Sequence, residues 1–164
     1  MKTLPIVWRS LEPAYEEARV GRIFNLRRPD RFPLAIVNVS EESHVIEVVK
    51  LALEKKCRIS VRSGGHSWAA WSLRDNAILV DFGNYHEMIL DQETGIVRVS
   101  PSTTSGDLNI YLLGEGRMFA GGHCPNVGLG GFLLQGGAGW NSRVQISETP
   151  FLTIADLLGL GLGM

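Results

Sequence analysis

The spacing of apolar and polar residues alternates between strand-like and helix-like segments over the first hundred positions. Three segments of strand length occupy residues 34–39, 57–62 and 77–82. Between the first two, apolar residues recur at helical spacing, which predicts a helix with one buried face. The residues of that face are Val45, Val49, Ala52 and Leu53. Strand, helix and strand in this order form a βαβ unit, which predicts parallel strands joined by a right-handed crossover.

The ends of this helix carry residues that favour helix termini. Ser40 is expected to be the N-cap, because its hydroxyl can accept a hydrogen bond from the first turn. Lys55 and Lys56 are expected in the last turn, where the helix dipole favours cations. An earlier helix is predicted over residues 11–24, with Pro13 near its start.

The second half of the chain predicts a different arrangement. Residues 88–91 and 95–99 form an expected antiparallel hairpin, with a glycine supplying the turn. A helix follows, capped by Thr103 or Thr104 and ending at Leu113 before two glycines. A small parallel part followed by antiparallel strands makes the predicted fold class α+β.

Composition excludes several classes of partner. The 164 residues include 16 basic and 17 acidic side chains, so the net charge of −1 does not favour nucleic acid or an anionic membrane. Two cysteines without a CxxC spacing and four scattered histidines predict neither a disulfide scaffold nor a metal site. No signal peptide and no apolar run of membrane-spanning length is visible, so we expect a cytoplasmic location and no membrane partner.

Two glycine-rich stretches, residues 60–68 and 119–131, carry the candidate chemistry. Glycine at this density lets a backbone approach a ligand closely, and strand-end loops of this kind present N–H groups to phosphates. His66 lies in the first stretch, where a ligand contact and a structural role both stay open. Cys124 lies in the second beside His123, and a cationic imidazole favours the reactive thiolate over an inert thiol.

The same two stretches also allow two alternative interpretations, a serine hydrolase and a dinucleotide-binding motif. Residues 65–69 (Gly-His-Ser-Trp-Ala) differ by one position from the nucleophile elbow of serine hydrolases, but an elbow must lead into a helix and residues 69–76 are turn-like. A dinucleotide-binding fingerprint needs GxGxxG at the start of a helix early in a βαβ unit. Residues 128–133 lack the last glycine of this motif, and they lie late in the chain.

Taken together, the segments 60–67 and 124–131 resemble the berberine bridge enzyme-like FAD-linked oxidases, which belong to the vanillyl-alcohol oxidase and p-cresol methylhydroxylase superfamily. The resemblance implies FAD bound bicovalently, through His66 to the flavin 8α-methyl carbon and through Cys124 to C6. It implies a loop that cradles the pyrophosphate and glycine segments that line the remainder of FAD. The implied cofactor-binding residues are Arg62, Ser63, Gly64, Gly65, His66, Ser67, Gly121, Gly122, Cys124, Val127, Gly128, Gly131, Gly136 and Gly137.

The same resemblance implies two α+β subdomains around FAD and an oxidase reaction. An alcohol, sugar or amine-type carbon would pass a hydride to FAD, and dioxygen would then accept the electrons as hydrogen peroxide. The expected organisation is an N-terminal helical lead and linker (1–32), an incomplete FAD-binding domain (33–143) and a tail (144–164) that departs from the family pattern.

The tail leads us to expect an incomplete FAD-binding domain without an identifiable catalytic base. The side chains left as candidates for that base are Tyr85, His86, Tyr111 and His123. A non-catalytic FAD-binding product therefore stays open beside the oxidase, and a serine hydrolase is the third hypothesis.

Overall fold

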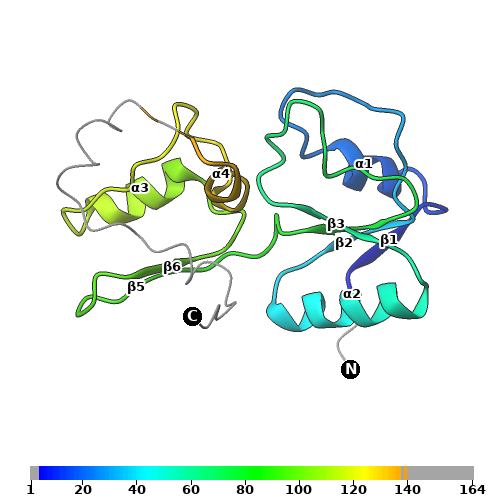
Figure 1. Cartoon of the computed structure of the whole chain (residues 1–164), viewed down its shortest axis with the longest axis horizontal. Coiled ribbons are helices and arrows are strands. Elements are labelled where there is room, and N and C mark those ends of the chain that lie inside the picture. Colours follow the sequence, from blue (N-terminus) through cyan, green and yellow to red (C-terminus); the bar gives the residue numbers. More distant parts are fainter. Residues whose placement is uncertain (1–3, 138, 140–164) are drawn as a thin grey trace. The chain divides into compact units, whose positions relative to one another are not determined.

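The computed structural model describes residues 4–137 and 139, and it divides into two units between Tyr85 and His86 (Figure 1). The first unit contains β1 (Ile6–Trp8), α1 (Ala14–Val20), β2 (Ala35–Asn38), α2 (Glu42–Glu54), β3 (Ile59–Arg62) and β4 (Ile78–Asp81). The second unit contains β5 (Met88–Leu90), β6 (Val97–Val99), α3 (Ser105–Leu113) and α4 (Leu129–Gln135). The fold class is α+β, as predicted.

The first unit is built on a sheet with the strand order β1-β2-β4-β3. Both β2 and β3 pair with β4 in parallel, which confirms the predicted parallel strands, although β4 separates the two strands of the βαβ unit. β1 pairs antiparallel with β2 and was not predicted, because it is short. The register places Asn38 and Arg62 on either side of Asp81. These three polar residues therefore lie together at the carboxyl ends of their parallel strands.

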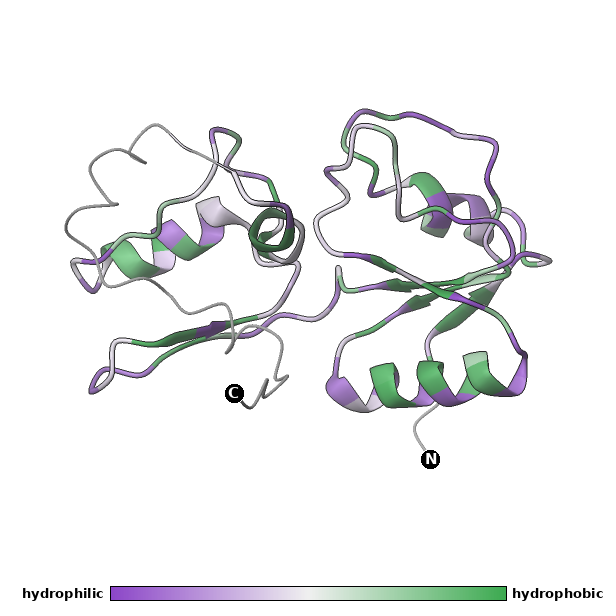
Figure 2. Ribbon diagram, viewed as in Figure 1, coloured by the Kyte–Doolittle hydropathy of each residue, from purple (hydrophilic) through white to green (hydrophobic). Residues whose placement is uncertain are grey.

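Helices cover both faces of this sheet, with α1 on one face and α2 on the other (Figure 1). One core cluster lies on the α1 side and includes Tyr15, Ile36 and Leu79, and the other lies on the α2 side and includes Val37 and Val80. Neighbouring residues of one strand therefore enter opposite cores. Burial on both faces explains why the strands are mostly hydrophobic along their length (Figure 2).

The two ends of α2 differ from the prediction. Glu41, not Ser40, is the N-cap, because the chain stays extended through Glu41 (φ −153°, ψ 160°). At the other end Lys55 is the C-cap and Lys56 lies beyond the helix with φ +52°. The Lys56 N–H donates to the Leu53 carbonyl and the next N–H donates to residue 52, which is a Schellman motif. This motif ends the helix before the lysines can occupy its last turn.

The buried face of α2 also differs in part. Val48 and Ala52 are buried against the sheet, and Val45 packs beside them. Val49 and Leu53 are exposed. Residues advance by about 100° around a helix, so a face centred on Val48 and Ala52 turns Val49 and Leu53 toward its flank. The predicted face was wrong for these two residues.

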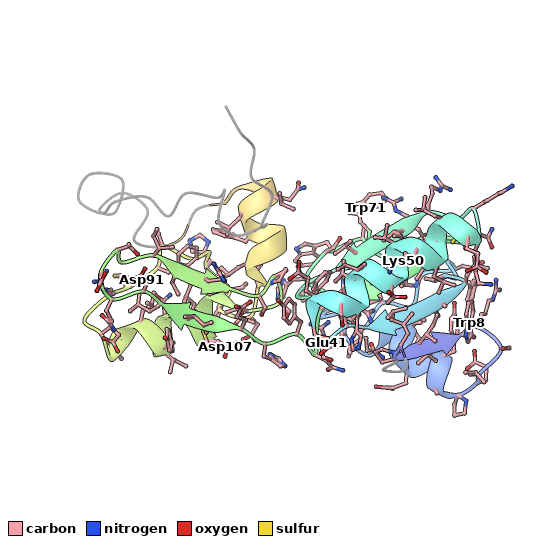
Figure 3. All side chains as sticks on the ribbon, turned by 90° about the horizontal axis from the view of Figure 1, so that it is seen from below. Trp8, Glu41, Lys50, Trp71, Asp91 and Asp107 are labelled. Atoms are coloured by element: carbon pink, nitrogen blue, oxygen red, sulfur yellow. The ribbon has the colours of Figure 1, made fainter. Side chains whose placement is uncertain are left out.

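The second unit contains the predicted antiparallel hairpin, in which β5 pairs with β6. Asp91 lies in its turn and Asp107 in the first turn of α3 (Figure 3). Thr104 is the N-cap of α3, and its hydroxyl accepts the Asp107 N–H at 3.1 Å, which confirms one of the two predicted caps. α4 was not predicted, because its first turn contains two glycines.

No helix in the described ranges 4–137 and 139 is long and apolar enough to cross a membrane. The predicted tail, residues 144–164, lies outside the described residues.

Candidate functional site

A buried ion-pair network joins the carboxyl ends of β3 and β4. Oδ2 of Asp81 accepts hydrogen bonds from Nε and Nη2 of Arg62 at 3.0 and 2.6 Å. Oδ1 accepts the Gly83 N–H at 2.9 Å and a hydrogen bond from Nη1 of Arg22. Arg62 also donates to the carbonyls of residues 18–19 at the end of α1, at 2.5 and 2.7 Å. The Arg62 side chain is therefore committed to the interior of the unit, which leaves its backbone for the loop that follows.

That loop is fixed to the segment that follows α1. Nη2 of Arg22 donates to the Ser63 carbonyl at 2.8 Å, and the Phe24 N–H donates to the Gly65 carbonyl at 3.3 Å. Gly65 has φ +70°, and a Cβ at this position would lie 1.8 Å from the carbonyl oxygen of Arg22. Only glycine fits so close to another backbone. The sequence analysis explains Gly65 by a bound ligand. The structure gives a second reason for glycine here, which is the close approach of the Arg22 backbone.

His66 is held by aromatic stacking. Its ring lies 4.0 Å from the Phe24 ring, with 10° between the two planes. Trp68 meets the same phenylalanine edge-on at 5.3 Å, and the Asn25 side chain donates to the Trp68 carbonyl at 3.0 Å. The imidazole is half-buried and has a defined position.

Ser67 has a local role in the turn after this loop. Its hydroxyl accepts the Trp71 N–H at 3.2 Å, and its carbonyl accepts the Ala70 N–H at 3.0 Å. Among the described residues no helix begins between Ser67 and β4. The strand–turn–helix geometry of a nucleophile elbow is therefore not formed, and the hydrolase hypothesis lacks its structural requirement.

The cysteine stretch wraps around the start of α3 in the second unit. The Pro125 carbonyl accepts the Gly106 N–H at 2.9 Å and the Ser105 hydroxyl at 3.3 Å. The Ser105 N–H donates to the Val127 carbonyl at 3.4 Å, and the Val127 N–H donates to the Cys124 carbonyl at 3.4 Å. Cys124 itself is a free, exposed thiol.

The remaining predicted glycines pack against nearby side chains and backbone. A Cβ on Gly121 would lie 2.5 Å from Cβ of Ser105, and one on Gly137 would lie 2.4 Å from the Phe132 ring. A Cβ on Gly122 would lie 3.2 Å from the same ring. Gly136 has φ +76° and open space around it.

The start of α4 is tied to the segment before α3. Gly128 is its N-cap, and Gly131 is exposed in its first turn. The Leu129 N–H donates to the Thr103 carbonyl at 2.8 Å, and the next N–H donates to the Pro101 carbonyl at 2.9 Å. These first amides of α4 have partners within the chain.

The structure thus assembles the predicted site residues as two local groups. Residues 62–67 lie at the carboxyl end of β3 in the first unit. Residues 121–137 lie around α3 and α4 in the second unit. The expected convergence of His66 and Cys124 on one flavin stays a prediction. Of the candidate bases, Tyr111 has a hydroxyl that accepts the Leu90 N–H at 3.2 Å, which ties it to the hairpin.

Sequence reasoning missed the residues that fix the first loop, Arg22, Phe24 and Asp81. Arg22 and Phe24 lie beyond the end of α1 in a segment without a motif, so nothing in the pattern marks them. Asp81 did leave a signal, because an acidic residue that ends a buried strand needs a cationic partner.

The residues present fit a bound dinucleotide. Ligands of sheets with parallel strands bind outside the carboxyl ends of those strands, which is where the loop at 63–67 lies. Two guanidinium groups surround one carboxylate there, so the network carries a net positive charge beside this loop. An imidazole and a free thiol are both available for bonding. Within the described residues no group of three His, Cys, Asp or Glu side chains could hold a metal ion.

Comparison with known proteins shows that the chain contains a flavin-binding domain. Residues 33–149 match the family described as FAD binding domain, and the chain belongs to that family. It is 45% identical over 159 residues to the FAD-linked oxidoreductase nodO of Hypoxylon pulicicidum, covering 96% of this chain and 35% of that protein. It is 35% identical over 138 residues to a xylooligosaccharide oxidase of Thermothelomyces thermophilus, covering 82% of this chain and 28% of that protein.

The fold comparison gives the same result. The BBE-like 1 protein of Physcomitrella patens superimposes with a TM-score of 0.75 at 27% identity, over 85% of this chain and 30% of that one. The resemblance to berberine bridge enzyme-like FAD-linked oxidases is confirmed, and FAD is the cofactor of the family. The chain spans about a third of the length of these relatives.

Proposed function

We propose that the FAD-binding region, residues 33–143, holds FAD covalently through His66 and Cys124. The observation that carries this proposal is the stacking of His66 on Phe24 at 4.0 Å, on a loop whose backbone is fixed at Ser63 and Gly65. A histidine that packs only for stability does not need a loop whose backbone is held at two carbonyls beside the carboxyl end of a parallel strand. An attachment residue does, because its ring must meet one carbon atom of the cofactor.

Each attachment is an oxidation with a defined balance. On attachment the imidazole or thiol would lose its proton, the flavin carbon would lose a hydrogen, and a C–N or C–S bond would form. Two electrons and two protons would be released for each bond, and dioxygen would take them up as hydrogen peroxide. His66 would supply a ring nitrogen to the 8α-methyl carbon, and Cys124 would supply its sulfur to C6.

The chain's own residues supply binding and orientation for the reaction. The backbone of residues 62–67 would contact the pyrophosphate, with Arg22 and Arg62 providing the positive field behind it. The residues at 121–122, 127–128, 131 and 136–137, all glycines except Val127, would line the rest of the cofactor. FAD, when bound, accepts a hydride and passes the electrons to dioxygen.

We propose a small-molecule substrate with an oxidisable alcohol, sugar or amine-type carbon, and dioxygen as the second substrate. The names of two relatives, a xylooligosaccharide oxidase and a carbohydrate oxidase of Microdochium nivale, support the sugar class. Both relatives are longer than this chain, so the substrate stays a class rather than one compound.

Acid precipitation of the purified holoprotein tests the attachment. We expect the flavin to stay in the protein pellet of the parent and of the single variants His66→Ala and Cys124→Ala, because one bond remains in each. The double variant should release the flavin to the supernatant. Cys57→Ala and His44→Ala serve as matched controls, since each removes the same functional group outside the two loops.

Free flavin in the acid supernatant of the parent protein would contradict the proposal. Retention of flavin by the double variant would also contradict it, because a third residue would then make the bond. Absorbance and flavin fluorescence of both fractions give the result without a substrate.

A further inference from the structure

The outer edge of β3 has open backbone hydrogen-bonding groups. Within the described residues β3 pairs with β4 on one side and forms the end of the sheet. The carbonyls of Arg58 and Arg62 accept hydrogen bonds at 2.9 and 3.0 Å from N–H groups of β4 and of the residue after it. Alternate residues of a strand direct their backbone groups to opposite sides, so those of Ile59 and Val61 point away from β4.

A pocket with both polar and apolar lining lies beside this edge of the sheet. Arg58 and Ser60 share their sheet face with Arg62, whose side chain reaches α1. The pocket is completed by the turn before β4. It is lined by Arg58, Ser60, Trp71, Ser72 and Arg74 and, at the strand edge, by Ile59, Val61 and Ala77. Trp71 lies beyond the β3 edge, whereas Trp8 lies on the side of β1 (Figure 3).

Two features of the pocket indicate an anionic hydrogen-bonding ligand. The hydroxyl oxygen of Ser60 is buried and has no hydrogen-bond partner in the described residues, which is destabilising until a ligand supplies one. The guanidinium of Arg74 lies 5.1 Å from the Trp71 ring, and neither Arg58 nor Arg74 forms an ion pair in the described part of the chain. The adjacent carboxylate of Asp75 accepts the Phe32 N–H at 2.7 Å.

The opposite face of the same edge is apolar and uncovered. Ile59 and Val61 are 37% and 56% exposed, and Val49 and Leu53 of α2 are 44% and 74% exposed. Lys55 of the same helix contacts the Trp8 ring of β1 at 5.1 Å. Val49 and Leu53 lie on the flank of α2 opposite to Lys55, so they face β3 rather than β1. A right-handed β2–α2–β3 crossover places this flank on the β3 side. Strands of parallel sheets are usually buried on both faces, which this edge is not.

We propose that the β3 edge binds an extended segment of another polypeptide, in which apolar and acidic residues alternate. The segment adds as a strand, and its backbone pairs with the open N–H and C=O groups of Ile59 and Val61. Its apolar side chains cover the exposed face beside α2, and its carboxylates enter the pocket of Arg58, Ser60 and Arg74. A second copy of this chain fits less well, because edge-to-edge pairing would bring the same arginines together.

Two hexapeptides with blocked ends serve as probes, one of alternating valine and glutamate and one of alternating valine and lysine. Binding to the ¹⁵N-labelled chain is followed by NMR. We expect saturable binding of the glutamate peptide, at least about tenfold tighter than that of the lysine peptide. The amide signals of Ile59 and Val61 should shift, and their hydrogen exchange should slow. Equal binding of both peptides would overturn the proposal.

Two variants separate the backbone and charge contributions. Val61→Pro removes only an outward N–H, so the ladder with β4 stays intact, while Val61→Thr keeps that N–H. We expect the proline variant to lose saturable binding and the threonine variant to retain it. Arg58→Glu should weaken the glutamate peptide about tenfold, whereas Arg27→Glu, an exposed position away from the pocket, should not.

The proposal is wrong if the proline variant binds as tightly as the threonine variant while its remaining amide signals match the parent. It is also wrong if sedimentation shows concentration-dependent self-association that Val61→Pro abolishes, because the edge then binds a second copy. Neither result depends on FAD, so this inference can fail while the proposed function holds.

Discussion

Replacement of Asp81 by asparagine tests whether the buried ion-pair network holds the first unit and its loop together. The carboxylate accepts two hydrogen bonds from Arg62 on Oδ2, and bonds from Gly83 and Arg22 on Oδ1. Asparagine keeps one acceptor oxygen, but its amide group then faces N–H donors. The buried guanidinium of Arg62 also loses its counter-charge, although its bonds to the carbonyls of residues 18–19 remain.

The expected loss follows from these contacts. A hydrogen bond to a charged group contributes about 1.5–3 kcal/mol, and two of them are lost. Removing one partner of a buried ion pair typically costs about 3–5 kcal/mol. Both approaches predict that Asp81→Asn lowers the free energy of unfolding of the first unit by about 3–5 kcal/mol, a large part of the stability of an ordinary domain.

Urea unfolding followed by tryptophan fluorescence measures this change, because three of the four tryptophans, Trp8, Trp68 and Trp71, lie in the first unit. Asp30→Asn is the matched control, since Asp30 is exposed and outside the network, and it should change stability by less than about 0.5 kcal/mol. A loss below about 1 kcal/mol for Asp81→Asn would refute the reasoning, because the network would then be no stronger than an exposed pair.

Three further predictions concern local features. Gly65→Ala should destabilise the first unit by more than about 2 kcal/mol, because left-handed strain of about 1–2 kcal/mol adds to a clash with the Arg22 carbonyl. Gly116→Ala is the control, because Gly116 has φ +64° but open space around it, so only the backbone strain should destabilise the second unit. Equal losses of stability in the two variants would contradict the clash at Gly65. The hydrogen bond from Arg19 lowers the pKa of Glu16 below its ordinary 4.5, so the stability it provides is present above pH 4.5 and is lost as pH falls through the folded value. The urea midpoint of the parent should therefore fall on acidification more than that of Glu16→Gln, and parallel pH profiles would contradict this. Thr104→Ala should cost about 1 kcal/mol in the second unit through loss of its N-cap, measured by thermal unfolding, and no change would contradict the cap.

The strands, the hairpin and the cap of α3 could be predicted from the sequence because each rests on a local signal. Residues 78–81 are apolar until a polar residue ends the strand, and Thr104 stands three residues before an acidic side chain. The order β2-β4-β3 could not be predicted, because two parallel strands joined by a helix need not be neighbours. Here β4, which comes later in the chain, lies between β2 and β3. Its position depends on packing across the whole sheet and not on a local signal.

The candidate site shows the same division. The glycine-rich loops stand out in the sequence, but their structural reason does not, since the Arg22 carbonyl that requires Gly65 lies 43 residues earlier. The buried face of α2 was misassigned because Val48 and Val49 are equally apolar. Only contact with the sheet selects Val48, and Val49 is left beside the exposed edge of β3.

Mass spectrometry of a proteolytic digest of the holoprotein tests the central claim, FAD held at both His66 and Cys124, most directly. The claim predicts one flavin-absorbing species in which the peptides containing these two residues are joined. Its mass should equal both peptides plus FAD, less two hydrogen atoms for each bond formed. Unmodified peptides at both positions beside free FAD, or flavin on a different residue, would contradict it.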